Sequence, residues 1–163
     1  MVKRPNILLS TLGTASELDT LRGLLREYAS SLQVDLCVQG FEEELLNLPG
    51  DYIEPRGSLL MAWVDTQLAG CCGLRPLDTV DYPNACEMKR LYVRPMWRNL
   101  GLGRRLAEAT LDCARMAGYS CVLLDTLHGM ETARAMYHEL GFEEIPPYYF
   151  NPNEGAHYLK VDL

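Results

Sequence analysis

The stretch "RNLGLGRRLAEA", from Arg98 to Ala109, joins a glycine-rich loop to the start of a helix. From residue 102 onward the apolar residues recur at helical spacing, at positions 102, 106, 109, 113 and 117. A glycine-rich entry lets successive backbone N–H groups converge near the positive end of the helix dipole, which suits a phosphate group. A tight turn without any ligand is the alternative explanation for Gly101 and Gly103.

The spacing around this loop excludes two common phosphate-binding motifs. A Walker loop ends in Gly-Lys-Ser/Thr, whereas Gly103 is followed by two arginines. A dinucleotide fingerprint needs a third glycine at the position where this chain has Leu106. What remains is the pattern R-x-x-G-x-G, directly after a segment that we expect to be a strand.

Length and charge limit the possible functions. The 163 residues predict one domain, residues 1–163, with a sizeable core. The net charge of −7 argues against nucleic acid or an anionic membrane as a general partner. No apolar run approaches the length of a membrane span, and the run at residues 7–9 is too short for the core of a secretory signal. We therefore expect a protein of the aqueous phase.

Cysteine and histidine usage gives no sign of a metal site. The six cysteines, at positions 37, 71, 72, 86, 113 and 121, contain no C-x-x-C pair. Cys71 and Cys72 lie in an apolar, strand-like run, where thiols usually pack in a core. The three histidines, at positions 128, 138 and 157, are scattered among polar residues. We expect reduced cysteines, a cytoplasmic location and no metal.

Hydrophobic periodicity predicts alternating strands and helices. Strands are expected at residues 6–12, on both sides of a turn at 65–67, and at 85–93, 120–126, 142–145 and 156–162. Helices are expected after Thr14, where Glu17 would complete a capping box, and at 40–48, 102–117 and 131–140. The strand–helix–strand unit at 85–126 should make its two strands parallel and adjacent, while the other strands pair antiparallel. This pattern predicts an α/β domain with a mixed sheet.

The loop at residues 98–103 follows "LYV" (91–93), and "ARAMYHELGF" (133–142) comes later in the chain. Together these motifs resemble the Gcn5-related N-acetyltransferase (GNAT) family, which has a Q/R-x-x-G-x-G/A loop and a later Tyr-x-x-x-Gly-Phe segment. The motif-level match runs from Glu87 to Phe142, and the order of elements is similar over nearly the whole chain. The resemblance implies a single-domain GNAT-like fold, with a mostly antiparallel mixed sheet, a central parallel strand pair splayed for acetyl-CoA, and helices on both faces.

The resemblance also implies acetyl-CoA as the cosubstrate. Loop amides would hold its pyrophosphate, and the backbone around Leu91 and Val93 would pair with its pantetheine arm. A backbone N–H near Leu91 would polarise the thioester carbonyl, as an oxyanion-hole donor does. Met130 stands where many members carry an asparagine that bonds the pantetheine, so that contact is left open. The implied cofactor-binding residues are Leu91, Tyr92, Val93, Arg98, Asn99, Leu100, Gly101, Leu102, Gly103 and Arg104.

Two side chains are candidates for the chemistry. Tyr137 aligns with the family tyrosine that protonates the leaving CoA thiolate, a step for which a phenol is suited. Its alternative role is aromatic packing under a helix. Glu87 stands where histone-acetylating members carry their general base. Its alternative is a charge that faces solvent or forms an ion pair with Lys89 or Arg90.

These residues predict direct transfer of an acetyl group from acetyl-CoA to a primary amine of a small molecule or peptide. The alternative is a non-catalytic acyl-CoA-binding regulatory domain that keeps the loop. Nucleic-acid contact through the arginines at 98–105 is opposed by the overall acidity, and we expect neither nucleic acid nor a membrane as partner. A covalent acyl-cysteine route lacks a base motif beside any cysteine. A homodimer is compatible with these expectations.

The acidic balance also bears on the acceptor. Three successive glutamates, Glu42 to Glu44, lie on the short second helix, which the family architecture would place near the acceptor entrance. Tyr148 and Tyr149 could offer ring faces to an ammonium group. We therefore expect a protonated amine rather than an anionic or purely apolar acceptor. A solvated helix start is the alternative explanation for the glutamates.

Overall fold

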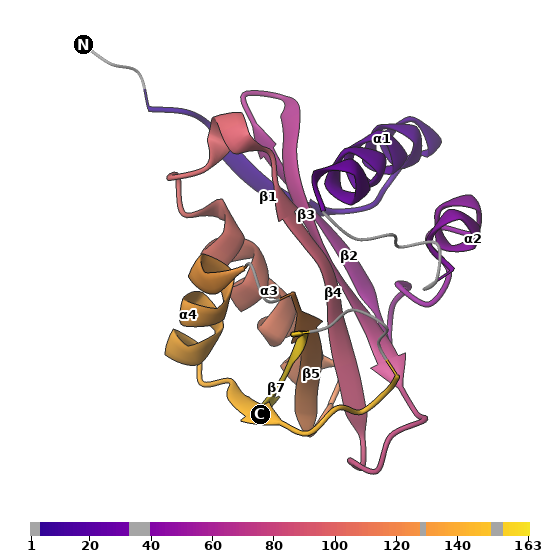
Figure 1. The fold of residues 1–163 in the computed structure, drawn as a ribbon. Helices are drawn as coiled ribbons and strands as arrows, with labels where there is room; N and C mark the ends of the chain where they lie inside the picture. The colour runs from indigo at the N-terminus through magenta and orange to yellow at the C-terminus, as the bar shows by residue number, and fades with distance from the viewer. Residues whose placement is uncertain (1–3, 33–39, 128–129, 151–154) are drawn as a thin grey trace.

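The computed structural model describes residues 4–32, 40–127, 130–150 and 155–163 (Figure 1). Cys37 and His128 lie outside the described residues. The strands are β1 Ile7–Thr11, β2 Ser58–Val64, β3 Gln67–Leu77, β4 Ala85–Val93, β5 Cys121–Thr126, β6 Glu143–Ile145 and β7 His157–Asp162. The helices are α1 Ala15–Ser31, α2 Phe41–Leu46, α3 Leu102–Met116 and α4 Glu131–Glu139, with a 3₁₀ turn at Pro95–Trp97.

Within the described residues, all of these strands belong to one sheet, in the order β1-β2-β3-β4-β5-β7-β6. Strands β4 and β5 are parallel, and the other neighbouring pairs are antiparallel. The predicted strand–helix–strand unit and α/β fold class are therefore confirmed. None of the described helices is long and apolar enough to cross a membrane.

Local signals account for most of the element boundaries. Thr14 and Glu17 form the expected capping box: the Glu17 N–H donates to Thr14 Oγ1 at 3.1 Å, and Glu17 Oε1 accepts from the Thr14 N–H at 3.0 Å. The short helix α2 ends at Leu46 rather than at the predicted residue 48. The 3₁₀ turn that begins at Pro95 was not predicted, because a proline after a strand indicates a stop but not the shape of the turn.

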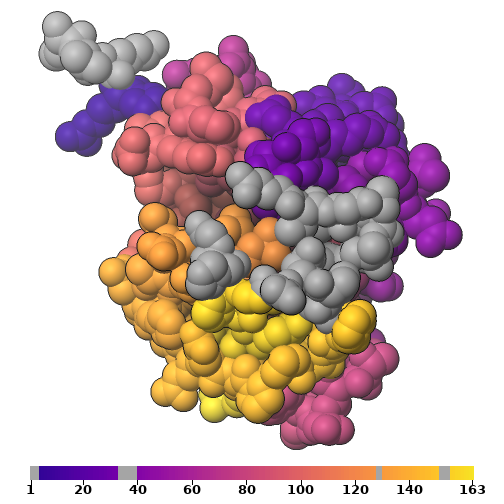
Figure 2. Space-filling model, viewed as in Figure 1, coloured from indigo at the N-terminus to yellow at the C-terminus, as the bar shows by residue number. Residues whose placement is uncertain are grey.

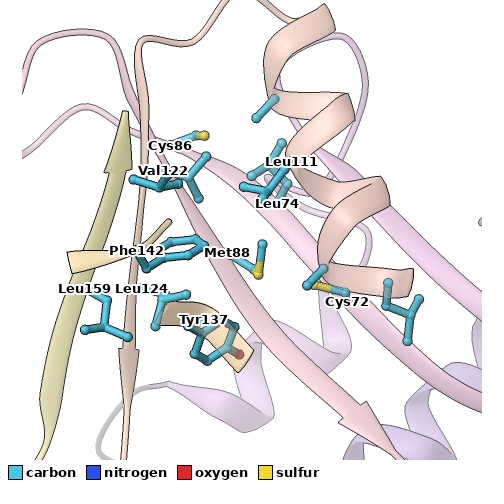
Figure 3. Packing of buried hydrophobic residues seen from close by; sticks show 14 of the residues in the cluster. Cys72, Leu74, Cys86, Met88, Leu111, Val122, Leu124, Tyr137, Phe142 and Leu159 are labelled. Carbon is cyan, nitrogen blue, oxygen red and sulfur yellow. The ribbon is translucent and has the colours of Figure 1, made fainter. Parts of the chain in front are cut away.

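Helices cover both faces of the sheet (Figure 1). Helices α1 and α2 pack on one face through a core that includes Leu21, Leu25 and Phe41. Helices α3 and α4 cover the other face, where the larger core surrounds Phe142 (Figure 3). Cys71 and Cys72 are both buried, as expected, and they face opposite cores because neighbouring strand residues alternate.

Candidate active site

The parallel strands β4 and β5 are paired only at their N-terminal ends. Their register runs from Ala85↔Cys121 to Glu87↔Leu123, and beyond this point the strands are not paired with each other. The splayed strand pair that the resemblance implied is therefore present. A cavity of about 730 Å³ lies here, lined by β4 residues 88–93, β5 residues 124–126, the loop before α3, α4, and the end of α1. In Figure 2, α1 (indigo), the region before α3 (salmon) and α4 (orange) meet on one face of the molecule.

A β-bulge in β4 shapes one wall of the cavity. Strand β3 pairs Cys71 with Tyr92 and Gly73 with Lys89, so β4 contains one extra residue opposite Cys72. Arg90 has a φ of 61°, in the left-handed region that costs an L-residue roughly 1–2 kcal/mol. A bulge interrupts the hydrogen-bond ladder, so backbone groups at this point are available to a ligand.

The loop before α3 presents backbone donors to the same cavity. Asn99 and Gly101 both have left-handed backbone conformations, with φ of 72° and 73°. The Arg105 N–H donates to the Gly101 carbonyl at 3.1 Å, and the N–H groups of residues 99–104 have no acceptor among the described residues. These free donors lie at the positive end of the α3 dipole, which is an anion-binding arrangement. The Arg98 Nε donates to the Val93 carbonyl at 3.0 Å, which holds this side chain beside the loop.

Tyr137 from α4 is buried and lines the cavity. Its ring meets Phe142 edge to face at 5.5 Å, and its hydroxyl is turned away from Phe142 (Figure 3). Within the described residues this hydroxyl has no hydrogen-bond partner. Burial raises the pKa of Tyr137 well above its usual value, so the phenol stays protonated. The arrangement places a neutral proton donor in the cavity.

A buried ion pair joins α2 to the bulge in β4. The Arg90 guanidinium binds Glu44 with both branches, at 2.8 Å from Nε to Oε2 and 3.2 Å from Nη2 to Oε1. The Tyr52 hydroxyl donates to Glu44 Oε1 at 3.2 Å. Only 4% of the Arg90 side chain and 14% of the Glu44 side chain are exposed. Glu44 is therefore engaged inside the protein, while Glu42 and Glu43 are exposed.

Glu87 is buried and pairs with neither Lys89 nor Arg90 within hydrogen-bonding distance. Arg75 donates to Glu87 Oε1 from Nε at 2.9 Å and approaches it with Nη2 at 2.8 Å. The Tyr148 hydroxyl donates to Glu87 Oε2 at 2.6 Å. Both carboxylate oxygens are thus occupied by donors, which satisfies the buried charge.

Comparison with known proteins supports what the geometry indicates. Residues 21–142 match the Acetyltransferase (GNAT) family. The chain belongs to the GNAT family. It is 35% identical to an uncharacterized N-acetyltransferase of Schizosaccharomyces pombe, over 100% of this chain and 99% of that protein. As a member of this family, the protein is an acyltransferase.

Solved GNAT structures share the fold. An acetyltransferase of the GNAT family from Staphylococcus aureus superposes with a TM-score of 0.79 at 19% identity, over 96% of this chain and 99% of that one. The PaiA N-acetyltransferase of Thermoplasma acidophilum, solved in complex with coenzyme A, has a TM-score of 0.74 at 16% identity, over 97% and 99% of the two chains.

The GNAT cavity collects most of the residues that the sequence singled out. Tyr137 and eight of the ten implied cofactor-binding residues line it, namely Leu91, Tyr92, Val93, Arg98, Asn99, Gly101, Leu102 and Gly103. Leu100 and Arg104 do not line it, and Arg104 instead pairs with Glu108 and Glu139 on the surface. Glu87 does not line it either. Met130 does, at the position where the family often carries asparagine.

Sequence reasoning missed Lys89 and Asp125 as cavity residues. A signal for Lys89 was available, because two adjacent basic residues inside an otherwise largely apolar strand must either pair or face a polar cavity. Asp125 directly follows a run of apolar residues in β5, and a carboxylate at such a position must likewise pair or face a polar cavity.

The described cysteines bear on a covalent acyl-cysteine route, and the described His, Cys, Asp and Glu side chains bear on a metal site. Burial raises the pKa of Cys72 and of Cys86 to about 12, which is the opposite of what a covalent acyl-cysteine mechanism requires. Within the described residues, no group of three or more His, Cys, Asp or Glu side chains could hold a metal ion.

Proposed function

We propose that this GNAT protein transfers the acetyl group of acetyl-CoA directly to the primary amine of a small molecule or peptide. The observation that carries the proposal is one cavity that joins the free N–H groups before α3, the bulged strand β4 and the Tyr137 side chain. An anion site, an extended backbone edge and a buried proton donor are the three features that a CoA thioester donor needs. The described cysteines are free, which is consistent with a cytoplasmic location as part of this proposal.

Each part of acetyl-CoA has a complementary surface in this proposal. The pyrophosphate binds the loop amides around Gly101 and Gly103, with Arg98 beside them. The pantetheine arm lies along β4 residues 91–93, where β5 no longer pairs with this strand. The thioester carbonyl then meets a backbone N–H near Leu91, at the bulge, which stabilises the negative charge that develops on the carbonyl oxygen.

The proposed reaction needs three proton movements, because the ammonium nitrogen loses two protons and the thiolate gains one. The amine nitrogen attacks the thioester carbon, a C–N bond forms, and the C–S bond breaks with its electron pair going to sulfur. Tyr137 donates its hydroxyl proton to that sulfur, and the second proton that the nitrogen loses restores the Tyr137 phenol. Glu87 is the proposed acceptor of the first proton, which the ammonium loses before the neutral amine attacks. Because Glu87 does not line the cavity and both of its oxygens accept hydrogen bonds, the proposed route runs through the Tyr148 hydroxyl, 2.6 Å from Oε2. Tyr148 gives its own hydroxyl proton to Glu87 as it takes the proton of the amine.

The loop part of the proposal predicts that Gly103→Val weakens acetyl-CoA binding. A Cβ at residue 103 would meet only Val93 Cγ2, at 3.9 Å, so the fold accepts a side chain there. The bulky side chain would block the approach of the pyrophosphate to the backbone. Titration calorimetry should show a dissociation constant at least about tenfold higher, a loss of about 1.4 kcal/mol.

Gly23→Val in α1 is the matched control, because a Cβ there meets nothing within 4 Å and Gly23 does not line the cavity. Gly101 is a poorer test, since its φ of 73° would strain any side chain. An unchanged dissociation constant for a folded Gly103→Val protein would remove this loop from the cofactor site.

The transfer itself is tested by thiol release from acetyl-CoA in the presence of polyamines, amino-acid amides, lysine peptides and aminoglycosides. The proposal predicts release that is stimulated by at least one protonated amine, at a rate that falls with added salt. A non-catalytic acyl-CoA-binding domain would instead bind acetyl-CoA and release CoA at one slow rate, whatever amine is present. That result would overturn the proposal.

A further inference from the structure

Three cationic side chains of β3 and β4, those of Arg75, Lys89 and Arg90, each lie beside a carboxylate. Lys89 and Arg90 also line the cavity. Two of the three side chains are already neutralised. Arg90 is bound by both oxygens of Glu44, and Arg75 approaches Glu87 at 2.8 Å. The charges of these two arginines are therefore balanced inside the protein, and neither needs an anionic ligand.

Lys89 is held more loosely than the two arginines, by an ion pair with Asp125 and by the ring of Tyr149, whose centroid lies 5.9 Å from Lys89 Nζ. Only 8% of the Lys89 side chain is exposed, and it lines the cavity. The nearest carboxylate oxygen, Asp125 Oδ1, lies 3.8 Å from Lys89 Nζ, which is longer than a hydrogen bond. The other oxygen, Oδ2, accepts a hydrogen bond from Tyr149 at 2.5 Å. Among the described residues, the Lys89 ammonium therefore has an ion-pair partner but no hydrogen-bond acceptor.

A buried ammonium without an acceptor is costly, so this position calls for a ligand that supplies one. Burial lowers the pKa of Lys89, while the charges of Glu87 and Asp125 act in the opposite direction. A bound anion would strengthen the charged form further. The two neighbouring carboxylates would repel a dianion such as phosphate, so a single negative charge fits best.

We propose that Lys89 binds a carboxylate of the acceptor, so that the acceptor is a small zwitterionic amine of the amino-acid class. This inference rests on the proposed function, because it assumes that the amine meets the thioester near Leu91. Lys89 precedes Leu91 by two residues across the bulge at Arg90, so their backbones lie at most about 7 Å apart. An amine and a carboxylate separated by one or a few carbon atoms can span that interval. The acidic composition predicts a protonated amine as acceptor, and this inference narrows that class to protonated amines that also carry a carboxylate.

The test compares free L-amino acids with their amides, which keep the amine but lose the carboxylate charge. Wild-type protein should show a higher kcat/KM for at least one amino acid than for its amide. In Lys89→Met the ratio of the two kcat/KM values should fall about 10- to 100-fold, the range expected for one hydrogen bond to a charged group. Lys160→Met is the matched control, because Lys160 pairs with Asp162 at 2.7 Å and does not line the cavity.

A binding measurement separates this inference from the proposed function. Amino acids and their amides are titrated calorimetrically into wild-type and Lys89→Met proteins that are saturated with CoA. Binding of amino acids that depends on Lys89 but leads to no acetylation would support the inference and defeat the proposed function. The inference would be overturned if the wild-type protein preferred amides or bound no amino acid. It would also be overturned if Lys89→Met weakened the binding of amino acids and of amides equally. If Lys89→Met lowered kcat equally for amino acids and for their amides, Lys89 would be a proton carrier instead.

Discussion

Turnover by the Tyr137→Phe variant should fall by about 10²- to 10⁴-fold, which is the usual contribution of a general acid. The KM for acetyl-CoA should change by less than about threefold, because the hydroxyl matters when the thiolate leaves rather than when the cofactor binds. Phenylalanine keeps the ring that packs edge to face on Phe142, so the fold should persist. Steady-state kinetics with a saturating amine would measure both constants.

Tyr119→Phe provides the control for removing a phenol from the same core. Tyr119 is buried, its hydroxyl donates to the Arg56 carbonyl at 2.5 Å, and it does not line the cavity. Its loss should leave kcat within about twofold of the wild-type value. If Tyr137→Phe retained nearly full turnover while a single-turnover experiment showed that chemistry was the slow step, Tyr137 would be a packing residue.

Loss of the Glu44 charge should have the largest effect on stability. In Glu44→Gln the buried Arg90 guanidinium keeps its charge but loses its carboxylate, which costs about 3–5 kcal/mol for buried pairs. The same ion pair holds Arg90 in its left-handed conformation at the bulge. Urea unfolding followed by circular dichroism should therefore show a much lower free energy of unfolding.

Glu42→Gln on the same helix is the matched control, because Glu42 is exposed and its loss should change the free energy of unfolding by less than about 0.5 kcal/mol. The double change of Glu44→Leu with Arg90→Met should recover most of the lost stability, since it leaves no unpaired charge. Equal stability of Glu44→Gln and Glu42→Gln would show that the ion pair is not formed in solution.

The fold and the shape of the proposed cofactor loop could be predicted because their signals are local. The R-x-x-G-x-G loop, the capping box and the segment around Tyr137 each occupy a few consecutive residues, so their spacing can be matched directly. The parallel pair followed from the single helix that connects β4 and β5, since such connections place the two strands side by side. These features depend on neighbouring residues and on general rules of connection.

The charge network could not be predicted in this way, because its partners are distant in the sequence. Glu87 pairs with Arg75, twelve residues earlier, and with Tyr148, 61 residues later. Glu44 pairs with Arg90, 46 residues away. The extra residue of the bulge is equally hidden, since it appears only when β4 is set against β3. The way in which strands and helices pack together decides which charged side chains meet. A local sequence pattern does not predict that packing.

The most direct test of the account follows the acetyl group itself. The protein is incubated with acetyl-CoA labelled with ¹³C in the acetyl group and with the best amine, and mass spectrometry is applied to the protein, the acceptor and CoA. Direct transfer predicts label on the amine nitrogen in a 1:1 ratio to released CoA by the stoichiometry of the reaction, with no label on any cysteine at any time. Label on the protein that later moves to the amine, or CoA release without a labelled acceptor, would contradict the account.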